Sequence, residues 1–236
     1  MPRVSSTPIV PTTANVMAVD GGRRVTYAVN KKISNLKAMF KGTGERDTRF
    51  PPNTIGLPYH SNTDAALALL KWADAQDIKA EPHAPLTVEA LQQSNPDVVI
   101  PNTLSTLVTY QAVANALRLR KQFRGNVLRD SILEYLKNTP LTATEFKLIA
   151  NELYADKEVI RTMMWQSLWN RRNLLYKKDG MDEEWTEIIN FINLWPNLVN
   201  LNLEQTVQID KIVAGKEARV KREAKKAAKK AKQEQA

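Results

Sequence analysis

The sequence contains no cysteine and only two histidines, His60 and His83, among its 236 residues. Without thiols the chain can form neither disulfide bonds nor a thiolate metal site, which fits a reducing compartment. Both histidines lie in segments that contain proline, and no serine motif, paired carboxylates or metal-ligand spacing accompanies them. We therefore expect a protein that is not an enzyme and that uses no metal and no cofactor.

Long apolar runs are also missing, because no segment approaches the roughly 18 apolar residues that a membrane-spanning helix needs. Residues 1–15 lack acidic side chains and carry Arg3, but three prolines interrupt any amphipathic helix, and there is no apolar signal core. We expect residues 1–20 to form a disordered arm. The protein is expected to be intracellular, cytoplasmic or nuclear rather than organellar.

Helical periodicity dominates the remaining sequence, and prolines separate the periodic segments. Residues 21–125 are predicted to form a helical N-terminal region with proline-rich loops. Residues 61–64 supply capping side chains for a helix over residues 65–75. Thr103 or Ser105 can begin a later, longer helix.

A basic cluster follows the N-terminal arm, because residues 21–49 contain eight Lys or Arg and only two acidic residues. Four apolar residues from Val29 to Phe40 recur at helical spacing, which predicts a basic amphipathic helix. The nearby stretch Gly42–Arg46 has neither the spacing nor the Lys-Ser/Thr pair of a phosphate-binding P-loop. The candidate nucleic-acid contacts in this cluster are Arg23, Arg24, Lys31 and Lys32.

Three helical patterns and a turn follow one another over residues 126–180. The second pattern begins at Thr142, which can form a capping box with Glu145. Asp156 can cap the third, after which Asn173–Gly180 is typical of a strand that enters a hairpin turn. The predicted order is helix, helix, helix and hairpin.

This order resembles the winged helix-turn-helix superfamily, over residues 126–180 and by pattern alone. In that superfamily the third helix lies in the major groove of DNA and the hairpin, or wing, reaches along the backbone. The contacts that the resemblance implies are Arg161, Thr162, Gln166 and Arg172 on the third helix, with Lys177 and Lys178 in the wing.

The third helix also carries an argument against groove insertion, because apolar residues surround most of it. At 100° per residue, one face contains Ile160, Met163, Met164, Ser167 and Leu168, whereas Trp165 and Trp169 fall on the far side beside Arg161 and Arg172. Two interpretations stay open. The tryptophans pack on a larger helical body, or they contact nucleic acid, a protein partner or a second copy of the chain.

The positive charge is concentrated at the C-terminal end, since residues 211–236 hold a net charge of +7 out of the chain's +9. Ala and Lys favour a helix, but the tail has no aromatic or leucine face to bury in a core or membrane. We expect a solvated helical extension that binds phosphates without sequence preference. Its candidate contacts are Lys216, Arg219, Lys221, Arg222, Lys225, Lys226, Lys229 and Lys230.

Two helices are expected between the wing and the tail. The first has acidic residues in its opening turn, where they suit the helix dipole. The second begins near Leu201 and runs into the tail, with Val207, Ile209, Ile212 and Val213 as its last anchoring residues. For the tail, a solubilising helix that binds nothing and a contact with an acidic protein or a membrane surface remain as alternatives.

Together these patterns predict a mainly α protein, a helical bundle that contains a winged-helix-like three-helix module with a small β-hairpin, plus a basic helical C-terminal tail. The expected divisions are the arm (1–20), the N-terminal region (21–125), the winged-helix-like domain with the following helix (126–200) and the tail (201–236). We expect a non-enzymatic nucleic-acid-binding protein, and the winged-helix resemblance favours DNA over RNA. The alternative is a structural or assembly subunit of a viral or ribonucleoprotein particle, located in a virion in the viral case, whose helical domain makes protein contacts.

Overall fold

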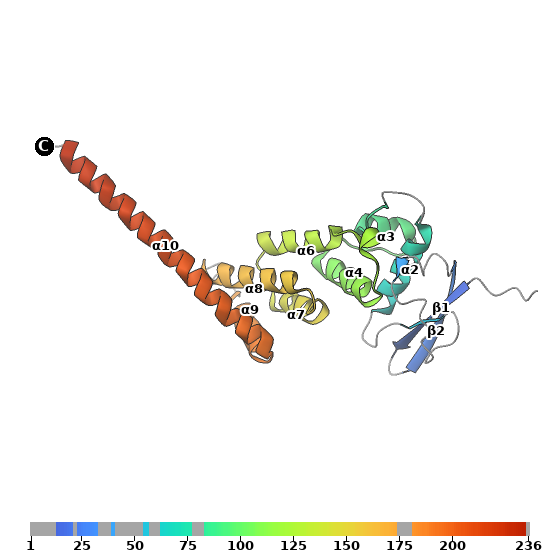
Figure 1. Cartoon of the computed structure of the whole chain (residues 1–236). Helices are drawn as coiled ribbons and strands as arrows, with labels where there is room; N and C mark the ends of the chain where they lie inside the picture. The colour runs from blue at the N-terminus through green and yellow to red at the C-terminus, as the bar shows by residue number, and fades with distance from the viewer. Residues whose placement is uncertain are drawn as a thin grey trace, which may run out of the picture. The chain divides into compact units, whose positions relative to one another are not determined.

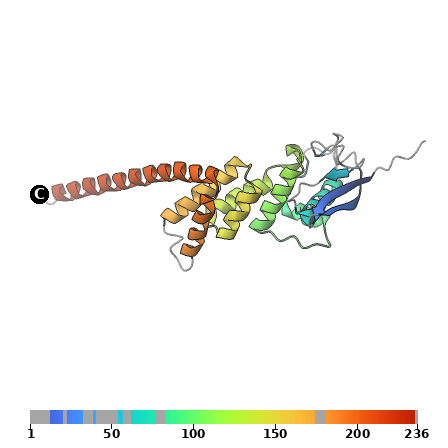
Figure 2. The same cartoon turned by 90° about the horizontal axis from the view of Figure 1, so that it is seen from below.

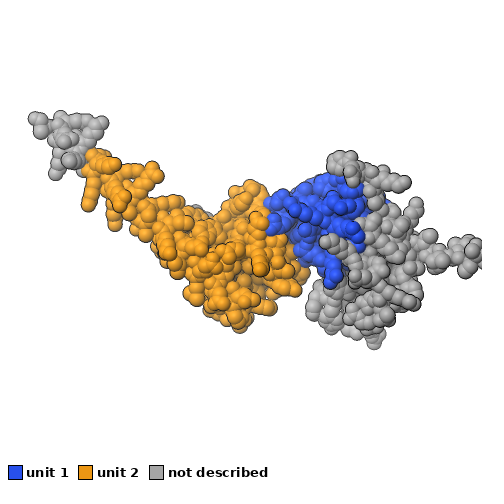
Figure 3. Space-filling model, viewed as in Figure 1, with its two compact units in different colours: residues 1–132 blue, residues 133–236 orange. Residues whose placement is uncertain are grey.

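The structure, a computed structural model, describes residues 13–20, 23–32, 39–40, 54–56, 62–76, 83–173 and 181–234. The chain divides into two compact units, residues 1–132 and 133–236, coloured blue and orange in Figure 3. Helix α6 (Val127–Asn138) continues from the first unit into the second. Most described residues are helical, which confirms the expected mainly α class (Figure 1).

The first unit begins with a small sheet in which β1 (Thr13–Asp20) lies between β2 (Arg23–Lys32) and β3 (Thr54–Gly56). β1 and β2 are antiparallel, and Asp20 pairs with Arg23. β3 is parallel to β1. Only two glycines therefore connect the first two strands.

This sheet corrects two expectations. Residues 13–20 are a paired strand rather than part of a disordered arm, and residues 29–32 belong to β2 rather than to a basic amphipathic helix. A Gly-Gly pair favours a two-residue hairpin turn, and Val25, Thr26 and Tyr27 are residues that favour strands. Residues 33–38, the middle of the expected helix, lie outside the described part.

In the described part of the first unit, the sheet is followed by α2 (Thr63–Ala75), α3 (Val88–Ser94), α4 (Leu104–Ala116) and α5 (Lys121–Arg124). The side chains of Asn62, Thr87 and Thr103 cap α2, α3 and α4 by accepting hydrogen bonds from backbone N–H groups. The predicted caps at residues 61–64 and at Thr103 are thus confirmed. The buried core of these helices includes Leu69, Leu70, Trp72, Leu86, Leu91, Val108 and Phe123.

The second unit contains α7 (Ala143–Glu152), α8 (Lys157–Arg172), α9 (Met181–Asn193) and α10 (Pro196–Glu234). The Thr142 hydroxyl accepts from the Glu145 N–H at 3.2 Å, and the Glu145 carboxylate accepts from the Thr142 N–H at 2.9 Å. This is the predicted capping box. The predicted cap at Asp156 is also present, since its side chain accepts from the Val159 N–H at 3.2 Å.

The core of the second unit lies where α7, α8 and α9 meet the first half of α10. Its buried residues include Phe146, Ile149, Val159, Met163, Met164, Ile188, Ile192 and Ile209. The predicted inner face of α8 is confirmed at Ile160, Met163, Met164 and Ser167, whereas Leu168 is only half-buried.

Helix α10 has 39 residues, and its second half extends alone beyond the other helices of its unit (Figures 1 and 2). The sequence indicated a start near Leu201, but the helix begins at Pro196, because proline has a suitable φ for a first helical residue and needs no hydrogen-bond acceptor. Within the described residues, no helix combines the length and the apolar character needed to cross a membrane.

The predicted wing falls on residues 174–180, outside the described residues. Helix α9 begins directly afterwards at Met181, and no strand follows Gly56 in the part of the chain that the structure describes. The helix order of α6, α7 and α8 matches the expectation, but the residues described after α8 contain no β-hairpin.

Candidate nucleic-acid interface

Helix α8, predicted to carry the groove contacts, packs against α10 through charged side chains. The guanidinium of Arg161 lies 2.8 Å from the Glu204 carboxylate, and that of Arg172 lies 3.5 Å from the Asp210 carboxylate. The Gln205 side-chain amide also donates to the Arg161 carbonyl oxygen at 2.9 Å. Both candidate arginines are therefore already paired within the chain.

The two tryptophans of α8 are half-buried rather than fully exposed. The Lys216 ammonium group of α10 lies 4.9 Å from the centre of the Trp169 ring, within range of a cation–π contact. Trp169 is thus partly covered by the chain's own C-terminal helix. This contact favours packing on a larger helical body over stacking on a partner.

The contact between α8 and α10 includes buried polar side chains. Ser167 and Gln205 are buried, and among the described residues the Ser167 hydroxyl and the Gln205 side-chain carbonyl have no hydrogen-bond partner. The Asn202 side-chain carbonyl is in the same state. Buried polar atoms without partners cost free energy, so this contact is stabilised less than its area suggests.

The other predicted contacts of the winged-helix module are not gathered into one surface by the described residues. Thr162 and Gln166 on α8 are half-buried. Lys177 and Lys178 lie outside the described part. Arg171, which the sequence did not single out, lies 2.5 Å from the Asp182 carboxylate of α9 and 5.9 Å from the centre of the Trp185 ring.

The N-terminal candidates lie on a strand, not on one face of a helix. Arg23 and Arg24 begin β2, and Lys31 and Lys32 end it. At about 3.3 Å per strand residue, the two pairs are separated by roughly 25 Å along the chain.

The second half of α10 gathers several exposed cations on one helix. Every residue from Ala214 to Ala227 is exposed. Among the described residues, Lys221, Arg222, Lys225 and Lys226 make no ion pair. The side chain of Arg219 forms an (i, i+4) pair with Glu223 at 2.9 Å.

The helix also sorts these residues by side. At 100° per residue, the cationic positions from 211 to 226 other than Lys216 fall within an arc of about 160°. They are Lys211, Arg219, Lys221, Arg222, Lys225 and Lys226. The opposite side carries Val213, Val220, Ala224 and Ala227. We call the first set the basic face of α10; the helix continues through Lys229 and Lys230, whose side chains are outside the described part.

The anchoring of α10 differs from the expectation. Ile209 is buried and Val213 is half-buried, as predicted. Val207 and Ile212 are instead 54% and 42% exposed, because the helix meets its unit along a narrow strip. The residues that sequence reasoning missed are Glu204 and Asp210, which lie on α10 and reach Arg161 and Arg172.

The titratable side chains of the described residues were also compared with the requirements of a metal site. No group of three or more His, Cys, Asp or Glu side chains in that part of the chain could hold a metal ion. Burial and the hydrogen bond to Glu145 raise the pKa of Tyr135. The same hydrogen bond, in which the Tyr135 hydroxyl donates to the Glu145 carboxylate, links α6 to α7. His83 packs its ring 4.2 Å from that of Phe123.

Comparison of the chain with protein-family models, curated proteins and solved structures found no match. The arrangement of the described residues separates paired cations on α8 from unpaired cations on α10.

Proposed function

We propose that this protein is a non-enzymatic nucleic-acid-binding protein whose main contact surface is the basic face of α10. The observation that carries the proposal is the contrast in pairing: Arg161 and Arg172 are held by acidic partners, whereas Lys221 and its neighbours are exposed and unpaired. Lysine and arginine side chains that neutralise phosphates release condensed counterions, which favours binding to any sequence.

Duplex DNA is the proposed target. The exposed stretch from Ala214 to Ala227 is about 21 Å long at 1.5 Å per residue, and a single α-helix fits the major groove of B-form DNA. The major groove of A-form RNA is too deep and narrow for the same docking. A basic arc of about 160° can reach the phosphates on both walls of the groove.

The test is a pair of variants with the same change in net charge. In the first, Lys221, Arg222, Lys225 and Lys226 are changed to Gln, which removes four unpaired cations of α10. In the second, Lys147, Arg161, Arg171 and Arg172 are changed to Gln, which removes four cations that are paired with acids. Affinity for a DNA duplex is measured over a range of salt concentrations.

We expect the first variant to lose affinity equally across sequences, with the slope of log affinity against log salt falling by up to about 3.6 at roughly 0.9 per phosphate contact. The second variant should keep most of the slope. Equal losses in the two variants would show an effect of net charge alone and would refute a contact surface on α10.

A more specific version of the proposal adds the winged-helix module as a second DNA-binding surface. Helices α6, α7 and α8 have the order of that module, and groove insertion of α8 would use Arg161, Thr162, Gln166 and Arg172. This use requires the two arginines to exchange Glu204 and Asp210 for DNA phosphates. A contact of Lys177 and Lys178 with the backbone is part of the same version.

A role as an assembly subunit is the second candidate, and exposed apolar residues favour it. Tyr154, Leu194 and Trp195 are 77%, 75% and 51% exposed in the turns that follow α7 and α9. The test changes Leu194 and Trp195 to Ser. Loss of higher-order assembly in light scattering, with nucleic-acid binding intact in the α10 Gln variant, would favour assembly over nucleic-acid binding.

A further inference from the structure

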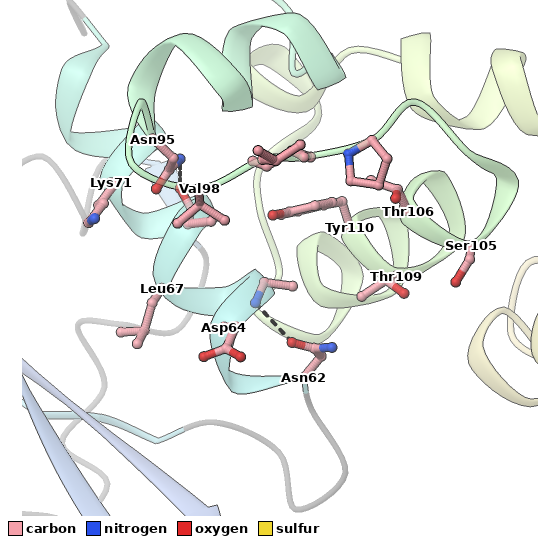
Figure 4. A pocket seen from close by; sticks show the side chains of 15 residues that line it. Asn62, Asp64, Leu67, Lys71, Asn95, Val98, Ser105, Thr106, Thr109 and Tyr110 are labelled. Carbon is pink, nitrogen blue, oxygen red and sulfur yellow. Dashed lines mark hydrogen bonds between the residues drawn. The ribbon is translucent and has the colours of Figure 1, made fainter.

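One side of α2 in the first unit carries opposite charges at its two ends. Asp64 and Lys71 are both exposed, and neither makes an ion pair with another described residue. They are seven residues apart, so they lie on one side of the helix at a separation of about 10.5 Å. Leu67, half-buried, lies between them, and Figure 4 shows all three on the same side of α2.

This side of α2 borders a hollow of about 520 Å³. Its walls are α2, the segment from Asn95 to Pro101 and the first half of α4. Tyr110 of α4 points toward the hollow and is 7% exposed (Figure 4). Burial and the nearby Asp64 carboxylate raise the pKa of Tyr110 above its ordinary value.

The rim of the hollow is apolar and held in place. Val98 and Val99 are 50% and 88% exposed. The Gln92 side chain fixes the segment that carries them, because its amide donates to the Val98 carbonyl at 2.7 Å and its carbonyl accepts from the Ile100 N–H at 2.7 Å. The side-chain amide of Asn95 donates to the carbonyls of Ala68 and Leu91. These bonds fix the position of two exposed valines beside the outward side of α2.

We propose that the outward side of α2, with the Val98–Val99 rim, is a self-association surface that takes a second copy of this chain. If two α2 helices pack antiparallel about a twofold axis near Leu67, Asp64 of one copy faces Lys71 of the other, and the reverse pair forms at the same time. A twofold interface requires a self-complementary patch, and a charge pattern that reverses along one helix side supplies it. Val98 and Val99 would lie at the edge of this contact, where an exposed valine of one copy meets the apolar wall of the other.

The surface is small, so the association should be weak and dependent on concentration. Its dissociation constant is expected to be on the order of 100 µM. This inference is independent of nucleic-acid binding, since none of its residues lies on α10. The protein must be freed of nucleic acid before measurement, because a shared duplex could bridge two copies.

The test uses charge reversal in the full-length chain, with sedimentation equilibrium as the readout. Asp64→Lys places Lys opposite Lys across the twofold axis, and Lys71→Asp places Asp opposite Asp. Each variant alone should lose at least about tenfold in association constant. An equimolar mixture of the two should associate again, because each contact then joins Lys to Asp. The doubly reversed chain should also recover.

Two further variants guard against a trivial effect on folding. Val99→Asp should weaken association. Val220→Asp, which changes an exposed valine on α10 outside the proposed surface, should leave it unchanged. Thermal unfolding by circular dichroism checks that each chain is folded. A wild type that stays monomeric up to high concentration, or a mixture of the two reversed chains that does not associate, would overturn the proposal.

Discussion

Helix α8 and the second half of α10 are both rich in cations, yet the structure uses them differently. On α8, Arg161, Arg171 and Arg172 all lie within 4 Å of carboxylates from other helices. On α10, the residues from Ala214 to Ala227 are exposed, and among those described the contact of Lys216 with Trp169 is the one ring or ion-pair contact to another helix of the unit (Figure 2). The number of cations in a helix therefore does not measure how much charge is available to a partner. The acids on neighbouring helices decide it.

The largest difference between the two helices is expected when one apolar side chain on each is shortened, a buried one on α8 and an exposed one on α10. Met163 is fully buried, whereas Val220 is 64% exposed. Met163→Ala should destabilise the fold by about 2–5 kcal/mol, because removal of the side chain leaves a cavity. Val220→Ala should change the free energy of unfolding by less than about 0.5 kcal/mol. Urea unfolding of both variants gives the values; similar effects would mean that the second half of α10 is packed.

A smaller effect is expected where the two regions meet, at Trp169 and Lys216. The Trp169 ring is half-buried, so Trp169→Ala should cost about 1–3 kcal/mol from lost burial and packing. Lys216→Gln should cost about 0.5–1 kcal/mol if the cation–π contact contributes. A double-mutant cycle from thermal unfolding isolates the pair. A coupling energy of zero would mean that Lys216 is as free as the rest of the tail.

The inner face of α8 could be predicted from the sequence, and so could the caps at Thr142 and Asp156. Both depend on residues within one helix or one turn, where local spacing determines the contacts. The pairing of Arg161 with Glu204 and of Arg172 with Asp210 could not be predicted, because these partners lie about 40 residues apart and meet only when α8 packs on α10.

The N-terminal misjudgement has a different cause. The apolar residues from Val29 to Phe40 fit a helical period, but the two glycines before Arg23 set a hairpin that extends the strand to Lys32. The exposed helical tail could be predicted from composition, because an Ala-Lys helix with no apolar face needs no tertiary partner to form.

A gain in stability is expected from the polar contact between α8 and α10. The Ser167 hydroxyl is buried with no hydrogen-bond partner, so Ser167→Ala should stabilise the fold by up to about 1 kcal/mol. Gln205→Ala is the matched control and should destabilise the fold by about 1 kcal/mol, because it removes the hydrogen bond to the Arg161 carbonyl. Chemical unfolding of the two variants decides the signs. A destabilised Ser167→Ala protein would show that the hydroxyl has a partner in solution.

The last prediction tests whether the paired arginines of α8 take part in binding at all. Changing Glu204 to Gln and Asp210 to Asn removes the carboxylates from Arg161 and Arg172 and raises the net charge by two. Each exposed pair contributes about 0–1 kcal/mol, so the fold should remain. If α10 supplies the contacts, affinity for a DNA duplex should rise slightly at low salt while the salt slope stays the same, because no new phosphate contact forms. A slope that steepens by about 1.8, the value for two added phosphate contacts, would mean that the released arginines bind DNA. That result would make α10 a cover for the groove-binding surface of α8 and would erase the distinction between the two helices.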